Sequence, residues 1–339
     1  MSRANSPAGD SLTPDKIGEW VYAFRESRVL LTAYELGIFT AVGDEAGTSG
    51  EVAASIGTHE RATDRLMNAL CAMGLLEKRE ERFTNSPLAS RYLVEGKPEY
   101  MAGLMHSVHL WDNWSILTNA VRTGKPAARP EINDRGQEWF AAFIAAMHER
   151  ASKQADDIVA LLDLEGVSQV LDVGGGSGVY AMAFVRAREA VRATVFDLPK
   201  VILLAQRYIE AEGLSDRIET VVGDYTTDDL GSGFDLVFLS AIVHSNSFDV
   251  NRELIRKCSD SLNPQGQVVV QDFIISEDRT SPPGAALFSL NMLVSTQAGD
   301  TYAESEVRMW MEDAGLSDII RQDTGFGTTQ IIGRKPGSG

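Results

Sequence analysis

Residues 170–178 read Val-Leu-Asp-Val-Gly-Gly-Gly-Ser-Gly. A short apolar run with one acid leads into four glycines within five positions, a pattern that predicts a buried parallel strand turning sharply into a helix. Glycine has no Cβ, so the backbone can adopt positive φ and lie against a ligand, close to the free N–H groups of the following helix. The stretch therefore predicts a small-molecule site, because a turn without a ligand would need fewer glycines.

The spacing within this turn narrows the class of ligand. Gly176, Gly178 and Ala181 satisfy only the weaker form of the dinucleotide pattern Gly-x-Gly-x-x-Gly/Ala. A phosphate-binding loop needs Lys followed by Ser or Thr after its last glycine, and residues 179–180 are Val-Tyr instead. Nucleoside triphosphate hydrolysis is therefore disfavoured.

Acidic residues stand at the carboxyl ends of three predicted strands. Asp172 lies beside the glycines, Asp197 follows the strand Arg192–Phe196, and Asp224 follows the strand Ile218–Val222. The second acid can accept from both hydroxyls of a ribose, and the third suits the amino group of adenine. The first suits a cationic amine. Three carboxylates around one crevice disfavour a pyrophosphate and favour a cation.

These motifs together resemble those of the S-adenosylmethionine-dependent small-molecule O-methyltransferases, the class I family of the caffeate and hydroxyindole enzymes and of many bacterial natural-product tailoring enzymes. The resemblance runs from about residue 15 to the end of the chain. It implies a Rossmann-like doubly wound α/β domain, S-adenosyl-L-methionine as cofactor with S-adenosyl-L-homocysteine as product, and a homodimer. The matching motifs are the glycine stretch, Phe196-Asp-Leu-Pro199, Gly223-Asp-Tyr225 and His244 after the strand Phe234–Ser240.

The resemblance also implies which residues bind the cofactor and the acceptor. Phe143 and Met147, one helical turn apart, match positions that touch cofactor or substrate in the family, although an apolar helix stripe is more often core. The acceptor pocket is expected from Met147, Phe288, Met292 and Leu293. The expected cofactor-binding residues are Phe143, Met147, Asp172, Gly174, Gly175, Gly176, Gly178, Asp197, Leu198, Gly223, Asp224, Tyr225 and Ser240.

His244 is the predicted general base. A neutral imidazole, whose pKa is ordinarily near ~6.5, can take the proton of a hydroxyl as a methyl group moves to the oxygen. The supporting acid of the family falls on Asp272, one methylene shorter than the usual Glu. The chain departs from the family at Ser245 and Asn246, where Asp and Trp commonly follow the histidine, and at Thr301, where a second acid is usual.

The predicted function is the transfer of a methyl group to a hydroxyl of a small aromatic acceptor. Two alternatives stay open at this point. Transfer to nitrogen, sulfur or carbon needs less help from a base. The altered residues beside His244 also allow a protein of this fold that binds the cofactor without transferring its methyl group.

Composition and charge restrict the partners. The chain has 339 residues, of which 44% are hydrophobic and 23% charged, the balance of a globular protein with room for two domains. A formal net charge of -17 argues against nucleic acid and anionic membranes. Cys71 and Cys258 are too few for a disulfide framework or a metal site. Without an export signal or an apolar span, we expect a cytoplasmic protein.

Residues 14–123 are predicted to form a helical, winged-helix-like dimerisation domain after a flexible N-terminus, residues 1–13. A largely apolar helix runs from Pro14 to Leu36, and Thr48 with Glu51 forms a capping box. Thr58 is predicted to cap a helix over 60–73, and a hairpin follows over 75–83. The charges of that helix and hairpin cancel, which favours dimerisation over DNA recognition.

Residues 124–335 are predicted to form the methyltransferase domain, followed by a flexible tail, residues 336–339. Strands and helices alternate there, which indicates a doubly wound sheet whose ligands lie beyond the carboxyl ends of the strands. The predicted helices are Tyr180–Arg188, Val201–Glu212 and Asn251–Leu262. The predicted strands, besides those already given, are Gln267–Asp272, Ile319–Gln322 and Gln330–Arg334.

Overall fold

The computed structural model describes residues 13–126 and 136–337. Of the predicted flexible ends, residues 1–12 and 338–339 lie outside the described residues. Contacts divide the chain into two compact units, residues 1–108 and 109–339, which are taken separately. The domain boundary predicted at 123/124 stays a prediction. Within the described ranges, no helix combines the length and the apolar character needed to cross a membrane.

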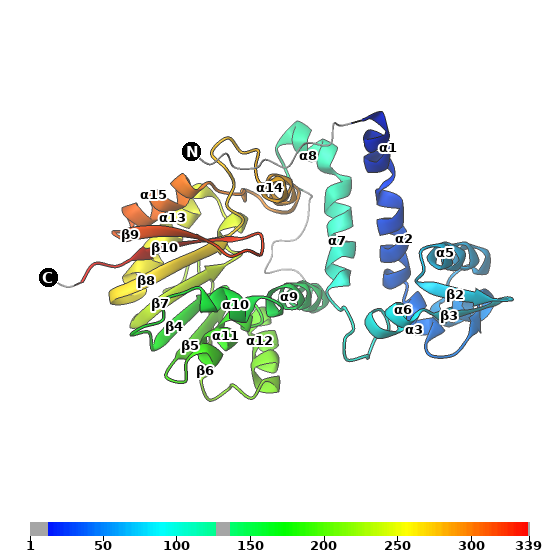
Figure 1. The fold of residues 1–339 in the computed structure, drawn as a ribbon, viewed down its shortest axis with the longest axis horizontal. Helices are drawn as coiled ribbons and strands as arrows, with labels where there is room; N and C mark the ends of the chain where they lie inside the picture. The colour runs from blue at the N-terminus through cyan, green and yellow to red at the C-terminus, as the bar shows by residue number, and fades with distance from the viewer. Residues whose placement is uncertain (1–12, 127–135, 338–339) are drawn as a thin grey trace, which may run out of the picture. The chain divides into compact units, whose positions relative to one another are not determined.

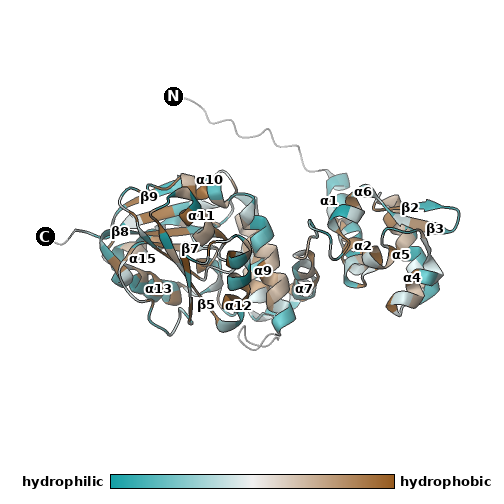
Figure 2. Ribbon diagram, turned by 90° about the horizontal axis from the view of Figure 1, so that it is seen from below, coloured by the Kyte–Doolittle hydropathy of each residue, from teal (hydrophilic) through white to brown (hydrophobic). Residues whose placement is uncertain are grey.

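The first unit is a set of helices around a small antiparallel sheet of order β1-β3-β2 (Figure 1). The hairpin formed by β2 and β3 is hydrophilic, as its teal colour in Figure 2 shows, while Phe39, Met67 and Phe83 fill the core beneath. Its elements are α1 (Pro14–Tyr22), α2 (Phe24–Glu35), α3 (Ile38–Val42), β1 (Gly47–Thr48), α4 (Ser49–Ile56), α5 (Glu60–Ala72), β2 (Leu76–Arg79), β3 (Arg82–Asn85), α6 (Pro87–Tyr92) and the start of α7 (Leu104–Ser115).

Local chemistry explains where these helices begin. The predicted capping box is present: Glu51 N–H donates to Thr48 Oγ1 at 3.2 Å, and Thr48 N–H donates to the Glu51 carboxylate at 2.7 Å. The predicted Thr58 cap is wrong. The N-cap of α5 is His59, and the Thr58 hydroxyl instead pairs with that of Thr63 at 2.7 Å.

The first predicted helix is also divided. The sequence predicted one helix over 14–36, but α1 ends at Tyr22 and α2 begins at Phe24, with Ala23 between them. Apolar periodicity continues across the break, so the pattern could not reveal it.

The second unit contains a seven-stranded sheet of order β6-β5-β4-β7-β8-β10-β9 (Figure 1). The five strands from β6 to β8 are parallel to one another. At one edge of the sheet, β10 is antiparallel to both of its neighbours, β8 and β9. The strands are β4 (Gln169–Val173), β5 (Arg192–Asp197), β6 (Ile218–Val222), β7 (Phe234–Ser240), β8 (Leu262–Asp272), β9 (Ser317–Asp323) and β10 (Thr329–Arg334).

Helices cover both faces of this sheet and complete two hydrophobic cores. Alternation along the strands directs Val170 to one core and Leu171 to the other. The first core contains residues of α10, α11 and α12, and the second those of α13 and α15. The helices are α8 (Leu117–Thr123), α9 (Gln137–Ser152), α10 (Ala155–Ala160), α11 (Val179–Ala187), α12 (Pro199–Ala211), α13 (Phe248–Ser261), α14 (Pro283–Ser295) and α15 (Glu304–Asp313).

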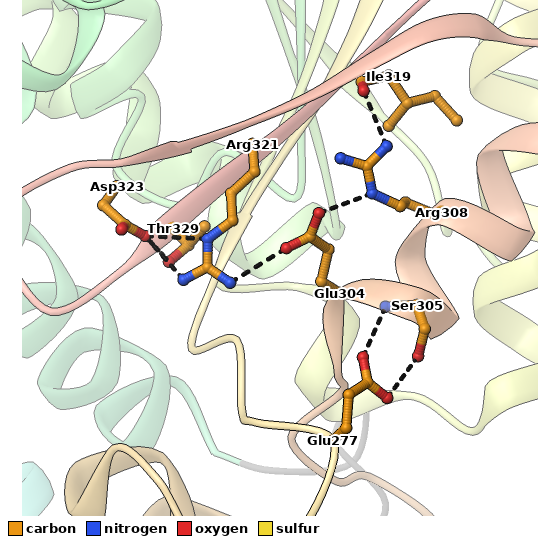
Figure 3. A network of polar contacts seen from close by, with 8 residues as sticks. All are labelled: Glu277, Glu304, Ser305, Arg308, Ile319, Arg321, Asp323 and Thr329. Carbon is orange, nitrogen blue, oxygen red and sulfur yellow. Dashed lines mark hydrogen bonds and ion pairs between the residues drawn. The ribbon is translucent and has the colours of Figure 1, made fainter. Parts of the chain in front are cut away.

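A polar network fastens the antiparallel edge to α15 (Figure 3). Glu304 accepts from Arg308 at 2.7 Å and from Arg321 of β9 at 3.2 Å. Glu277, in the segment after β8, accepts from the Ser305 hydroxyl at 2.8 Å. Exposed ion pairs add little stability singly. This network fixes the segment that leaves the carboxyl end of β8, where the predicted supporting acid lies.

Candidate functional site

The glycine turn after β4 is packed too tightly for side chains at two positions. A Cβ on Gly175 would lie 2.7 Å from Asp172 Oδ2, and one on Gly174 would overlap the Ile242 side chain. Gly176 and Gly178 adopt φ of +60° and +76°, a region that L side chains disfavour. The turn therefore brings its backbone to the carboxyl edge of the sheet. It lies beside the neighbouring strands β4 and β7, where the strand order reverses and where α/β folds bind ligands.

Asp172 lies beneath this turn. Its side chain is buried, and Oδ2 accepts from the Ala181 N–H at 3.2 Å. Burial raises the pKa of Asp172 to about 7, and the neighbouring charge of Asp197 adds to the increase. A positive charge bound at the turn would offset this cost.

Asp197, at the end of β5, joins the glycine turn to the next loop. Its Oδ2 accepts from the Gly176 N–H at 2.9 Å, and its Oδ1 accepts from the Leu198 N–H at 2.7 Å. Burial raises its pKa to about 6, against the lowering effect of these two bonds. A carboxylate has about four acceptor sites, so the oxygens retain capacity for ligand hydroxyls.

The loop after β6 is held by an acid of its own, Asp224, and by Lys257, which was not among the predicted site residues. Asp224 Oδ1 accepts from both the N–H and the hydroxyl of Thr226, at 2.9 and 2.6 Å. Lys257 of α13 donates to the carbonyls of Tyr225, Thr226 and Asp228 at 3.0, 3.2 and 2.9 Å. Gly223 has no room for a Cβ because the ring of Phe196 occupies that space.

Asn246, where the chain departs from the family pattern, connects this loop to the predicted base. Its Oδ1 accepts from the Tyr225 hydroxyl at 3.2 Å, and its Nδ2 donates to Asn251 at 3.0 Å. Asn251 is fully buried and donates to the carbonyl of Val243 at 2.8 Å. The Tyr302 hydroxyl donates to the Asn246 carbonyl at 2.6 Å. The segment beside His244 is thus fixed by neutral amides.

His244 and Asp272 lie together, as expected. His244 occupies a short 3₁₀ helix, Val243–Ser245, and its Nδ1 is 2.8 Å from Asp272 Oδ1. The carboxylate also accepts from the backbone N–H groups of His244 and Phe273, at 3.3 and 2.8 Å. An Nδ1–H that donates to a carboxylate leaves the lone pair of the neutral ring on Nε2. Asp272 therefore orients the ring and sets its tautomer.

Two phenylalanine rings lie beside the imidazole of His244. Phe288 of α14 makes an edge-on contact with His244, with ring centroids 4.8 Å apart, and Phe273 lies 4.4 Å from Phe288. Among the other predicted acceptor residues, Met292 is buried in α14. Leu293 lines a hollow of about 330 Å³ together with residues 296–300. We call Phe273 and Phe288 the aromatic wall.

The other predicted site residues have side chains that contact their own helix or sheet, or that are buried. Phe143 is partly buried and stacks on Trp139 of its own helix at 5.2 Å, and Met147 is partly buried one turn later. The Ser240 hydroxyl accepts from Gln271 inside the sheet, at 3.2 Å. Thr301, where the resemblance implied an acid, is buried, and its hydroxyl finds no hydrogen-bond partner in the described parts of the chain.

One contact of the site came from a residue that sequence reasoning passed over. His148 of α9 lies 2.9 Å from the hydroxyl of Ser177 in the glycine turn, and its ring stacks on Tyr208 at 4.2 Å. Burial lowers the pKa of His148, so the ring is favoured in its neutral form. This contact joins α9, which carries Phe143 and Met147, to the glycine turn.

Comparison with known proteins identifies the family. The family model of the O-methyltransferase domain matches residues 114–317. The chain belongs to the O-methyltransferase family. The model of the O-methyltransferase dimerisation domain matches residues 19–95, so this O-methyltransferase carries the predicted helical dimerisation domain ahead of the α/β fold.

Relatives cover nearly the whole chain of this O-methyltransferase. It is 35% identical over 301 residues to 3-hydroxy-5-methyl-1-naphthoate 3-O-methyltransferase of Streptomyces sahachiroi, covering 87% of each protein. It is 32% identical to the tetracenomycin polyketide synthesis 8-O-methyl transferase TcmO of Streptomyces glaucescens, covering 95% and 97%. Human N-acetylserotonin methyltransferase, solved with S-adenosylmethionine, has a TM-score of 0.80 at 26% identity, covering 97% and 100%.

Proposed function

We propose that this S-adenosylmethionine-dependent O-methyltransferase methylates a hydroxyl of a small aromatic acceptor, with His244 as general base. The observation that carries the proposal is the His244–Asp272 pair at 2.8 Å, placed against the aromatic wall at the carboxyl edge that also holds the glycine turn. The names of the naphthoate and polyketide relatives agree with an aromatic acceptor.

The acids of the site suit the cofactor. Bound S-adenosylmethionine supplies an activated methyl group on a positively charged sulfur. Asp172 and Asp197 carry raised pKa values because burial penalises their charges, and a cationic ligand without phosphate relieves that penalty. We assign Asp197 to the ribose, Asp172 with Gly174, Gly175, Gly176 and Gly178 to the methionyl end, and Leu198, Gly223, Asp224 and Tyr225 to the adenine side. Phe143, Met147 and Ser240 keep their predicted roles as further cofactor contacts.

His244 and Asp272 carry out the proton transfer from the acceptor hydroxyl. Nε2 of His244 takes the proton of the acceptor hydroxyl, since Nδ1 is committed to Asp272. The Asp272 carboxylate stabilises the resulting imidazolium and is itself held by two backbone N–H groups. Met147, Phe288, Met292 and Leu293 are assigned to the acceptor, whose ring they position by apolar contact.

The dimerisation domain supports a homodimer. Five large apolar residues of α1 and α2 are more than half exposed in the single chain, and such a surface indicates an interface. They are Ile17, Trp20, Val21, Tyr22 and Phe24. We propose that a second copy of this chain covers them.

The test is transfer of a labelled methyl group from S-adenosylmethionine to a panel of phenols, naphthols and matched aryl amines and thiols, read by mass. Products methylated on oxygen are expected. Exclusive methylation of the amines or thiols would contradict the assignment of the accepting atom. Cofactor binding without any product would favour a binding protein.

A further inference from the structure

Arg150 stands at the acceptor side of the site without an assigned role. It lies in the last turn of α9 and is exposed, and its guanidinium carbon is 4.8 Å from the centre of the Phe273 ring. Phe273 belongs to the aromatic wall and follows Asp272 directly. Met147, assigned to the acceptor, precedes Arg150 by three positions, so both lie on one side of the helix.

The cation of Arg150 has no anionic partner in the described parts of the chain. The protein has 48 acidic and 31 basic residues, so carboxylates are in excess. Arg279 pairs with Glu306 at 2.7 Å, and Lys153, which caps the end of α9, pairs with Glu149 at 3.5 Å. Arg150 makes neither an ion pair nor a hydrogen bond among the described residues, and its contact with the ring uses none of its five N–H donors.

A planar guanidinium that rests on an aromatic ring presents its N–H groups to a carboxylate in a paired arrangement. We propose that Arg150 binds a carboxylate of the acceptor, so that the preferred acceptor is an aromatic hydroxy acid. This inference rests on the proposed function, because it assumes that the acceptor ring lies at the aromatic wall.

The carboxylate of the cofactor's methionyl end has the same chemistry, but the contacts favour the acceptor. Two residues of α9 reach the glycine turn: the Ile144 side chain lies beside Gly176, and His148 contacts the hydroxyl of Ser177. Arg150 is two positions further along, which turns it by about 200° around the helix. Its guanidinium contacts the ring of Phe273, which directly follows the supporting acid Asp272.

The test uses 3-hydroxy-1-naphthoate and 2-naphthol, which share the hydroxyl and differ in the carboxylate. Wild type, Arg150→Met, Arg150→Lys and the control Lys153→Met are compared by kcat/KM. Calorimetry measures binding of each compound to the enzyme with S-adenosylhomocysteine, and of S-adenosylhomocysteine alone. Arg150→Met should lose about ten- to hundredfold with the naphthoate in both measurements and less than about twofold with the naphthol. Arg150→Lys should recover part of the loss, and the control should resemble wild type.

The outcomes separate the inference from the function it rests on. If wild type methylates neither compound, the proposed activity fails for these acceptors, and the binding measurements still decide the role of Arg150. Equal losses with both compounds, or no binding of the naphthoate to wild type, would overturn the inference. Weaker binding of S-adenosylhomocysteine to Arg150→Met, with no selective loss of the naphthoate, would assign the arginine to the cofactor and also overturn it.

Discussion

Asp197→Asn changes the cofactor site at the residue that joins two of its loops. The wild-type carboxylate accepts from the N–H groups of Gly176 and Leu198 through separate oxygens. Asparagine offers one oxygen and one NH₂ group. Whichever way the amide turns, one of the two backbone donors faces another donor and loses its partner. The negative charge that would accept from a ribose also disappears.

Two effects on the ligand-free fold oppose each other. The pKa of Asp197 rises from 3.8 to about 6, so its charge costs about 3 kcal/mol at pH 7, and the amide avoids this cost. Because the pKa of Asp197 is higher in the folded protein, this residue contributes stability to the fold below pH 3.8, and the contribution is lost as pH rises through about 6. The unpaired N–H costs about 1–3 kcal/mol, so the Tm should change by only a few degrees.

In contrast, nothing offsets the loss of cofactor affinity that Asp197→Asn should cause. Losing one charge-assisted hydrogen bond costs about 1.5–3 kcal/mol, or roughly ten- to hundredfold in Kd. Calorimetry with S-adenosylhomocysteine at about pH 7.5 measures this loss, and thermal unfolding of the same samples measures the Tm. Wild-type affinity should also fall as pH decreases through about 6, and the variant should lack that dependence. An unchanged Kd would refute the assignment of Asp197 to the cofactor.

Three further changes test other parts of the molecule. Gly175→Ala places a Cβ 2.7 Å from a carboxylate oxygen and should cost about 1–3 kcal/mol in unfolding free energy, whereas the control Gly284→Ala meets no described atom within 4 Å. Equal denaturation midpoints for the two variants would contradict the tight packing of the turn. Lys257→Met removes three bonds to the loop after β6 and should weaken S-adenosylhomocysteine binding several-fold with little change in Tm, and calorimetry that finds equal affinity would show that the loop holds itself. Replacing Trp20 and Phe24 together by Glu should convert a dimer into monomer or aggregate in light scattering, and a monomeric wild type would end the dimer proposal.

The fold was predictable where backbone chemistry leaves a mark in the sequence. The glycine turn after β4 combines positive φ with close packing, and only glycine meets both demands. The Thr48–Glu51 capping box was confirmed for the same reason, since it depends on two residue types at fixed spacing. The break at Ala23 and the failed cap at Thr58 lack such a mark, because local packing decides them.

The site was predictable at strand ends and less so elsewhere. Asp197, His244 and Asp272 reach one edge of the sheet because parallel strands share their carboxyl ends. Lys257 and Arg150 lie on helices, where basic residues are common on the surface. Their contacts therefore become visible only in the three-dimensional structure.

The claim that His244 removes the acceptor proton is tested by single-turnover rates of His244→Ala with a phenol that wild type methylates. Transfer by the variant should be slower by about 10²–10⁴-fold, with S-adenosylhomocysteine affinity nearly unchanged. Asp272→Asn should show a milder loss of the same kind, because it removes the carboxylate that orients the ring. A His244→Ala enzyme equal to wild type from about pH 6 to 9 would contradict the claim.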